Sequence, residues 1–290
     1  MKYKLTNETK KINNKILYRI KALKNFGNVK RGDLGGFVQS EKNLSQKGLC
    51  WIYNEAKVYD NARVCDNARV CDNARVYDEA WVCENARIYG DAEVYGEAEV
   101  FDNARVYDKA GVYDNARVWG KARVYGDAEV YGRAWAYGNA QVFGHARVYD
   151  DARVYDDAQV YGKAQVYGYA LIYGKAQVFG HARVFDDARV YGEADVYGDA
   201  RVYGKADVYG DAWVFDNARV YDKADVYDNA RVYDNARVYD EAWVYDEAQV
   251  YGDAQVWGKA WVYGNAGVYG EARVFGEAKV YGYARVFDEA

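Results

Sequence analysis

The sequence predicts an all-β protein: a single-stranded parallel β-solenoid with a triangular cross-section and a short N-terminal β cap. A six-residue unit (a hexad), x-Val-Tyr-[Asp/Gly]-x-Ala, repeats from Trp51 to Ala290 without insertion or deletion. The 290-residue chain contains no proline, which suits long ladders of backbone hydrogen bonds. Residues 1–50 lack the hexad and are predicted to cap the repeats, because a terminal coil otherwise exposes unpaired strand edges.

Each hexad is predicted to form a short strand followed by a bend. Counted from Trp51, position 2 is nearly always Val, position 6 is Ala, and position 1 between them is usually polar or Trp. This alternation is typical of a strand with one buried face. Position 4 is Asp or Gly except at Asn54 and Glu84, and these residue types tolerate the positive φ of a tight corner. A period of six does not keep Val on one face of a helix.

Short strands joined by identical bends generate a solenoid, and three hexads would close one 18-residue coil. Like residues recur at position 1 slightly more often at a separation of 18 than at six or twelve, which favours the triangle. With strands about 4.8 Å apart, about thirteen coils follow. Val and Ala would line a narrow dry interior. Tyr at position 3 would stack on the Tyr of the next coil at an outer corner, with its hydroxyl in water.

Two domains are predicted: a β-hairpin and capping segment with a degenerate first coil at 1–50, and the hexapeptide-repeat solenoid at 51–290. Within the cap, residues 2–12 and 15–23 read as two strands joined at Asn13-Asn14.

The degenerate first coil is predicted at residues 32–48. Three apolar side chains, those of Leu34, Phe37 and Leu44, are expected to point inward there.

The pattern resembles the bacterial hexapeptide-repeat proteins of the transferase hexapeptide superfamily. Hexads such as the following carry the resemblance: Arg63-Val64-Cys65-Asp66-Asn67-Ala68 and Gln177-Val178-Phe179-Gly180-His181-Ala182. The resemblance covers about four fifths of the chain and implies a left-handed parallel β-helix. Familiar members are trimeric acyltransferases, in which the residue after Val is usually small or acidic rather than Tyr.

The leader is similar to that of a bacterial and phage branch of these proteins with no assigned activity. It contains the segments Leu17-Tyr18-Arg19-Ile20 and Gly32-Asp33-Leu34-Gly35-Gly36-Phe37-Val38.

Composition narrows the environment and the partners. The net charge of −5 does not fit a polycation that binds nucleic acid, and no signal peptide or membrane span is recognisable. A cytoplasmic location without cofactor or metal is therefore expected. Cys65, Cys71 and Cys83 occupy the Tyr slot, and Cys50 precedes the first hexad. These cysteines are interpreted as small apolar substitutes rather than as a disulfide framework or a metal site.

His145 and His181 are the only histidines, both at position 5. The resemblance to acyltransferases makes them the only candidates for a general base, which must face a substrate cleft. No loop interrupts the hexads to build such a cleft. The triangular register places the two histidines on one edge, two coils apart with Lys163 between them, so exposed corner positions are the favoured interpretation.

Two sets of outward residues are candidate interaction surfaces. The tryptophans share a face in the triangular register and could contact a protein, whereas packing on the sheet surface is the alternative. The arginines form a column that could grip a polyanion, with neutralisation by nearby carboxylates as the alternative. The two sets are Trp81, Trp135, Trp243 and Trp261, and Arg183, Arg201, Arg219 and Arg237.

Acidic columns are predicted where Asp216 lies over Asp234 and Asp222 over Asp240. They could hold Ca²⁺ between coils, but they lack the Gly-Gly-x-Gly-x-Asp pattern of calcium rolls.

The favoured function is a non-catalytic rigid solenoid that serves as a structural scaffold or protein-interaction rod. Its partner is an unknown protein or a second copy, bound through the final coil, which stops on the complete hexad 285–290. Two alternatives stay open: an acyltransferase-like hexapeptide enzyme, and an acidic mimic of nucleic acid of a phage-associated type.

Overall fold

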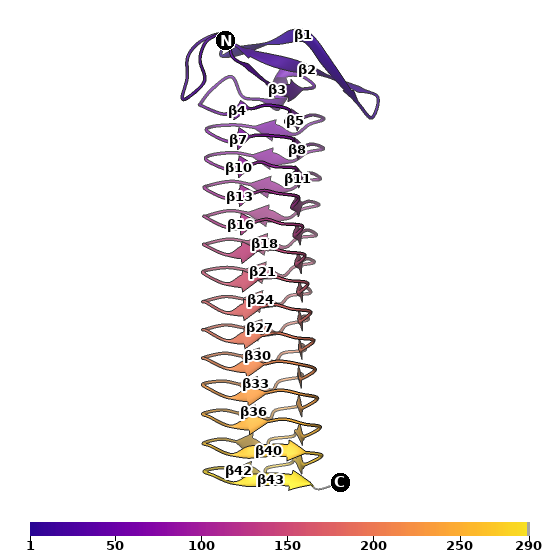
Figure 1. Cartoon of the computed structure of the whole chain (residues 1–290), viewed down its shortest axis with the longest axis vertical. Helices are drawn as coiled ribbons and strands as arrows, with labels where there is room; N and C mark the ends of the chain where they lie inside the picture. Colours follow the sequence, from indigo (N-terminus) through magenta and orange to yellow (C-terminus); the bar gives the residue numbers. More distant parts are fainter. Residues whose placement is uncertain (289–290) are drawn as a thin grey trace. The chain divides into compact units, whose positions relative to one another are not determined.

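The computed structural model describes residues 1–288 and is all-β, with one short 3-10 helix, η1 (Glu41–Asn43), in the part described. The chain divides into two compact units, Met1–Asn139 and Ala140–Ala290. Each is a parallel β-solenoid made of short strands, and the first also carries the antiparallel N-terminal strands (Figure 1).

The first unit begins with the predicted hairpin. Strands β1 (Tyr3–Ile12) and β2 (Lys15–Ala22) pair antiparallel, and Asn13 and Asn14 turn between them with positive φ. Strand β3 (Leu34–Val38) pairs antiparallel with β2 and parallel with the first repeat strand of its sheet. β3 therefore converts the hairpin into the solenoid ladder.

The prediction for the first coil is confirmed at Leu44, which is fully buried and bridges in parallel to Val64 of the next coil. Phe37 is also fully buried, but it is in register with Lys57 at the outward position 1, so it points away from the interior and packs beneath Lys10 and Arg19 of the cap. The prediction is wrong for Leu34, which is 54% exposed. Leu34 is the first residue of β3, three residues before the parallel pairing with β5 begins at Phe37, so it lies outside that ladder.

Three sheets form the walls of the first unit. The first continues from β3 through β5 (Lys57–Val58), β8 (Arg75–Val76), β11 (Glu93–Val94), β14 (Gly111–Val112) and β17 (Glu129–Val130). The second contains β4 (Trp51–Ile52), β7 (Arg69–Val70), β10 (Arg87–Ile88), β13 (Arg105–Val106) and β16 (Arg123–Val124). The third contains β6 (Arg63–Val64), β9 (Trp81–Val82), β12 (Glu99–Val100), β15 (Arg117–Val118) and β18 (Trp135–Ala136).

The second unit also has three walls. Wall A contains β20 (Arg147–Val148), β23 (Gln165–Val166), β26 (Arg183–Val184), β29 (Arg201–Val202), β32 (Arg219–Val220), β35 (Arg237–Val238), β38 (Gln255–Val256) and β41 (Arg273–Val274). Wall B contains β19 (Gln141–Val142), β22 (Gln159–Val160), β25 (Gln177–Val178), β28 (Asp195–Val196), β31 (Trp213–Val214), β34 (Arg231–Val232), β37 (Gln249–Val250), β40 (Gly267–Gly270) and β43 (Arg285–Asp288). Wall C contains β21 (Arg153–Val154), β24 (Leu171–Ile172), β27 (Arg189–Val190), β30 (Asp207–Val208), β33 (Asp225–Val226), β36 (Trp243–Val244), β39 (Trp261–Val262) and β42 (Lys279–Val280).

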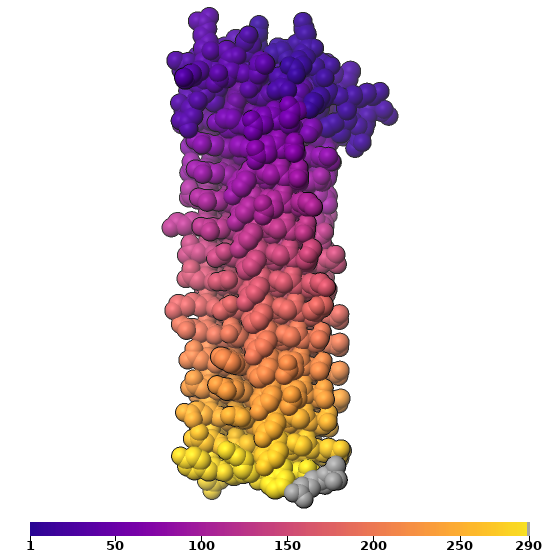
Figure 2. All heavy atoms as spheres, viewed as in Figure 1, coloured from indigo at the N-terminus to yellow at the C-terminus, as the bar shows by residue number. Residues whose placement is uncertain are grey.

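The predicted 18-residue coil is confirmed by the strand register. Parallel partners lie one coil apart in sequence, as Arg183 and Arg201 do in wall A, and consecutive hexads lie in different walls. Each unit therefore has the three-walled section expected of a triangular solenoid, and Figure 2 shows its side chains in regular tiers. The left-handed sense that the resemblance implies stays a prediction.

The interior is also as predicted. The residues at positions 2 and 6 are buried in both units up to Val274, as at Val154 and Ala158, so nearly every wall of these coils contributes a β-branched side chain and a methyl group to the interior. In the last coil Ala278 and Ala284 are exposed. Burying these side chains drives folding because each removes apolar surface from water.

The corners combine a left-handed residue with a stacked ring. Position 4 has positive φ from Asn54 to Gly282, for example 58° at Asp234 and 69° at Gly252. Position 3 rings stack on those of the next coil, with 4.8 Å between the ring centroids of Phe179 and Tyr197 and 6° between their planes. The predicted Tyr stack is therefore confirmed. The rings are half-buried rather than free in water, and burial raises the pKa of Tyr227 to about 12.

The cap is fastened to the first coils by charge and close packing. Arg19 of β2 bonds Glu8 and Glu55, and Lys10 of β1 also pairs with Glu55. Gly36 is required for this approach, because a Cβ there would lie 2.5 Å from the backbone oxygen of Ala56.

A buried cation lies beneath the cap. Lys2 is 1% exposed, and its Nζ donates hydrogen bonds to the carbonyl oxygens of Cys50 at 3.0 Å and Lys47 at 3.2 Å. Trp51 is also buried there, against the edges of Tyr3 and Phe26, so it is not part of an exposed tryptophan surface.

The interpretation of the cysteines as small apolar substitutes is wrong for two of them. Cys65 and Cys83 form a disulfide, with their Cα atoms 4.7 Å apart. They occupy the same corner in consecutive coils, at position 3, where other coils carry stacked aromatic rings. Their sulfur atoms and Asp66 form a cluster of metal-ligand type, but sulfurs joined to each other are not thiolate ligands. Cys50 and Cys71 are free thiols.

Within residues 1–288, no helix is long and apolar enough to cross a membrane. The cytoplasmic location stays a prediction, and disulfides are more typical of oxidising compartments.

Candidate functional site

The histidines lie where the register predicts. The backbone N–H of His145 donates to Gly162 O, and the N–H of Lys163 donates to Gly180 O, each at 2.7 Å, so His145, Lys163 and His181 follow one another along a corner. Both histidine side chains are exposed. Neither lines the groove described below.

The candidate tryptophans lie on outward-facing strand positions. Trp81 on β9 and Trp135 on β18 belong to the same sheet of the first unit. In the second unit, Trp243 and Trp261 are neighbours in wall C, and their rings stack with 5.2 Å between centroids. Lys279 places its Nζ 4.6 Å from the centroid of the Trp261 ring. The second unit thus presents a tryptophan pair with a cation on one side.

The four candidate arginines form the predicted column on wall A. They follow one another in register on β26, β29, β32 and β35. No ion pair within 4 Å involves any of the four in the described part of the chain, whereas Lys223 at a neighbouring corner pairs with Glu241. The column therefore retains its positive charge at the surface.

The acidic columns have a structural role that sequence reasoning missed. The N–H of Asn217 donates to Asp234 O, and that of Lys223 to Asp240 O, which places these aspartates over Asp216 and Asp222 as predicted. The carboxylate of Asp234 accepts the N–H of Gly252 at 3.0 Å. Asp at position 4 thus turns the chain and also satisfies a backbone donor of the next coil, which Gly cannot do.

Wall C also carries a pair of half-buried carboxylates. Asp207 and Asp225 are neighbours in register, and burial together with the charge of Asp207 raises the pKa of Asp225 to about 6. Arg189 Nε lies 3.2 Å from Asp207 Oδ1 but without the geometry of a hydrogen bond. The negative charge of this pair is therefore only partly compensated by Arg189.

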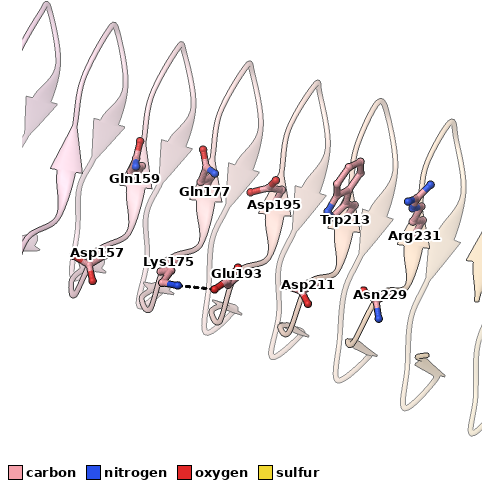
Figure 3. Close-up of a pocket in the computed structure, with 10 residues that line it drawn as sticks. All are labelled: Asp157, Gln159, Lys175, Gln177, Glu193, Asp195, Asp211, Trp213, Asn229 and Arg231. Carbon is pink, nitrogen blue, oxygen red and sulfur yellow. Dashed lines mark hydrogen bonds and ion pairs between the residues drawn. The ribbon is translucent and has the colours of Figure 1, made fainter. Parts of the chain in front are cut away.

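A groove of about 650 Å³ runs along wall B of the second unit (Figure 3). One side is formed by position 1 residues and the other by the corner residues two places before them. The first set is Gln159, Gln177, Asp195, Trp213 and Arg231, and the second is Asp157, Lys175, Glu193, Asp211 and Asn229.

Within the groove, most charges are already engaged. Lys175 Nζ pairs with Glu193 at 2.7 Å, and the Arg231 guanidinium lies 4.9 Å from the centroid of the Trp213 ring. Asp195 has an oxygen, Oδ1, that is buried without a hydrogen-bond partner, and burial raises the pKa of this carboxyl group.

Sequence reasoning missed the groove because every hexad looks alike at the level of core and corner. The available signal was a change among the position 1 residues that recur every 18 residues, from Gln141, Gln159 and Gln177 to Asp195 and Trp213. Short side chains beside a large one on a flat wall leave a recess.

Comparison with known proteins finds a similar repeat. Six segments match the family model described as the YdcK beta solenoid repeat. They are residues 68–84, 140–156, 146–162, 176–192, 224–240 and 230–246. No curated protein matches the chain. The matched segments lie in both units, in agreement with the solenoid described above. The broader hexapeptide transferase superfamily and the phage branch stay predictions.

The predicted association surface at residues 285–290 includes Glu289 and Ala290, which lie outside the described residues.

Proposed function

We propose that the chain is a non-catalytic β-solenoid scaffold whose walls hold a protein partner or a second copy in fixed register. The observation that carries the proposal is the constant spacing of like side chains along a wall, as in the arginine column of wall A. Strands lie about 4.8 Å apart, so such a column presents charges at regular intervals without a flexible loop.

Two surfaces of the second unit suit this function. The arginine column is complementary to an acidic protein surface. The stacked pair of Trp243 and Trp261 offers large exposed aromatic area, which is enriched in protein contacts.

The acyltransferase-like alternative has less support. A general base acts within reach of a bound substrate. His145 and His181 are exposed on a corner, away from the groove of wall B. The nucleic-acid mimic is also less well supported, because carboxylates such as that of Asp234 bond the backbone of their own solenoid.

The proposal is tested with a photo-crosslinking amino acid at position 201 or 243 of the full chain, expressed in its cell of origin. Position 249, on wall B, is the matched control. Adducts with a protein or a second copy at 201 or 243, absent at 249, support the scaffold. Adducts at none of the three positions, or equally at all of them, contradict it.

A separate assay addresses catalysis. Saturable transfer from acetyl-CoA by the purified chain, abolished by His145→Ala or His181→Ala, would falsify the non-catalytic assignment.

A further inference from the structure

The groove of wall B combines hydrogen-bond donors and acceptors along one line. Gln159, Gln177 and Asn229 each carry an amide that both donates and accepts, and carboxylates and cations lie among them. Tyr161 donates its hydroxyl to Gln177 Oε1 at 3.1 Å, which leaves the amide N–H groups of Gln177 for another acceptor. A ligand that satisfies this set must itself donate and accept.

Asp195 provides the clearest unmet requirement. Its Oδ1 is buried without a partner, although buried polar atoms in folded proteins are nearly always hydrogen-bonded. Its neighbours in register are Gln177 and Trp213, and neither donates to that oxygen. The same carboxylate lines the groove, so a ligand hydroxyl bound there can donate a hydrogen bond to it.

Trp213 forms an apolar plate at the same place. It is 39% exposed, and Arg231 covers its ring from the β34 side. On the other side stands the shorter side chain of Asp195, so the outer part of the indole rises above it (Figure 3). An indole face beside hydrogen-bonding groups suits the C–H face of a sugar ring, which is apolar on its faces and polar at its rim.

The charges argue against an anionic ligand. The lining carries four carboxylates, those of Asp157, Glu193, Asp195 and Asp211, against the two cations Lys175 and Arg231, so it repels a polyanion. A neutral ligand avoids this repulsion, and the spermine probe below tests the cationic alternative.

We propose that the wall B groove binds a neutral, hydroxyl-rich linear carbohydrate. One sugar ring stacks on Trp213, a hydroxyl of that ring donates to the carboxylate of Asp195, and the amides of Gln159 and Gln177 bond the rings that follow. The lining residues recur at the strand spacing of about 4.8 Å, which is close to the length of one sugar ring in an extended chain. The ligand therefore lies across the strands, with about one ring to each coil.

This inference is independent of the scaffold function. A solenoid that holds proteins through walls A and C can bind a glycan on wall B, and failure of either leaves the other intact.

The test is calorimetric titration of the full chain with three neutral oligosaccharides: cellohexaose, maltohexaose and chitohexaose. Spermine and heparin serve as the cationic and anionic probes. The variant Trp213→Gln introduces the residue that wall B already carries at Gln159 and Gln177, so the fold is expected to persist. The matched control is Trp243→Gln, which changes an equally exposed tryptophan on wall C.

The proposal expects saturable binding of at least one neutral oligosaccharide. Trp213→Gln should weaken it about tenfold or more, Asp195→Ala should also weaken it, and Trp243→Gln should leave it unchanged. Three results overturn the proposal: no binding of any neutral oligosaccharide, binding that Trp213→Gln and Trp243→Gln affect equally, or binding of spermine or heparin alone. Circular dichroism of each variant checks that loss of binding is not loss of fold.

Discussion

The rings of Tyr209 and Tyr227 lie parallel, with 4.8 Å between their centroids and 2° between their planes. This separation equals the usual distance between hydrogen-bonded strands. The aromatic column therefore continues the order of the backbone ladder at the outer corner, and each ring contacts one ring in the coil before it and one in the coil after it.

Replacing a ring in the middle of a stack tests its contribution to stability. Tyr227 stacks on Tyr209 and Tyr245, so Tyr227→Ala loses two stacked pairs. A loss of about 1–3 kcal/mol in the free energy of unfolding is expected from two such pairs. Urea denaturation followed by circular dichroism measures it. The control is Tyr227→Phe, which keeps the ring, as Phe185 does at another corner, and should resemble the wild type. Equal losses for Ala and Phe would show that stacking is not the cause.

The corner aspartates are expected to contribute in two separable ways. Asp234 has a φ of 58° and accepts the N–H of Gly252. Asp234→Gly removes the hydrogen bond, at a cost of about 1 kcal/mol, and also removes the Cβ that the left-handed region disfavours. Asp234→Ala removes the same bond but keeps a Cβ, without the short polar side chain that lets Asp adopt this region, so it should be about 1–2 kcal/mol less stable than the Gly variant. The Gly variant is therefore expected to melt above the Ala variant, and an Ala variant as stable as the Gly variant would contradict this.

Asp225 predicts a pH dependence of stability. Its pKa of about 6 in the folded chain lies above the ordinary value of 3.8, because of burial and of the charge of Asp207, while Arg189 acts in the opposite direction. The folded state therefore holds a proton that the unfolded chain releases, and stability falls as the pH rises through this window.

Asp225→Asn removes the titrating carboxyl group, and with it the fall in stability as the pH rises. Thermal melts should show the variant more stable than the wild type at about pH 7.5 and closer to it at about pH 4, the lower end of the window. Asp253→Asn, at an exposed corner, is the control. A variant that is less stable than the wild type at neutral pH would refute the assignment of Asp225 as a strained carboxylate.

The disulfide predicts a thiol count. Unfolding the oxidised chain without reductant should expose two titratable thiols, those of Cys50 and Cys71. Peptide mass spectrometry should recover Cys65 linked to Cys83. Four thiols in protein purified without reductant would show that the pair is not formed.

Much of the fold could be predicted from the sequence because one physical rule repeats. Alternation of Ala and Val fixes the inward face, and the residues at position 4 fix the corner, as Asp234 and Gly252 do. The disulfide could also have been predicted, because Cys65 and Cys83 are 18 residues apart and residues one coil apart at position 3 face each other. That inference needed only the register already used for the tyrosines.

The candidate site was less predictable. The groove depends on Arg231 folding over Trp213 and on Asp195 lacking a donor, and both are properties of side-chain conformation rather than of the repeat. The exposure of Leu34 likewise depends on which neighbouring element covers the first residue of β3. Sequence periodicity predicts what all hexads have in common. The groove and the exposed Leu34 arise where one hexad differs from the others or has different neighbours.

The central claim is that complete coils are interchangeable modules stacked on a Val and Ala interior. Deleting residues 237–254 removes one coil and joins Ala236 to Gln255 in register. Deleting residues 237–257 leaves half a hexad without its Val, as the matched control. Thermal melting followed by circular dichroism should place the one-coil deletion within about 5 °C of the full chain, and the control well below it. Equal melting temperatures for the two deletions, or a one-coil deletion that fails to fold, would contradict the modular solenoid.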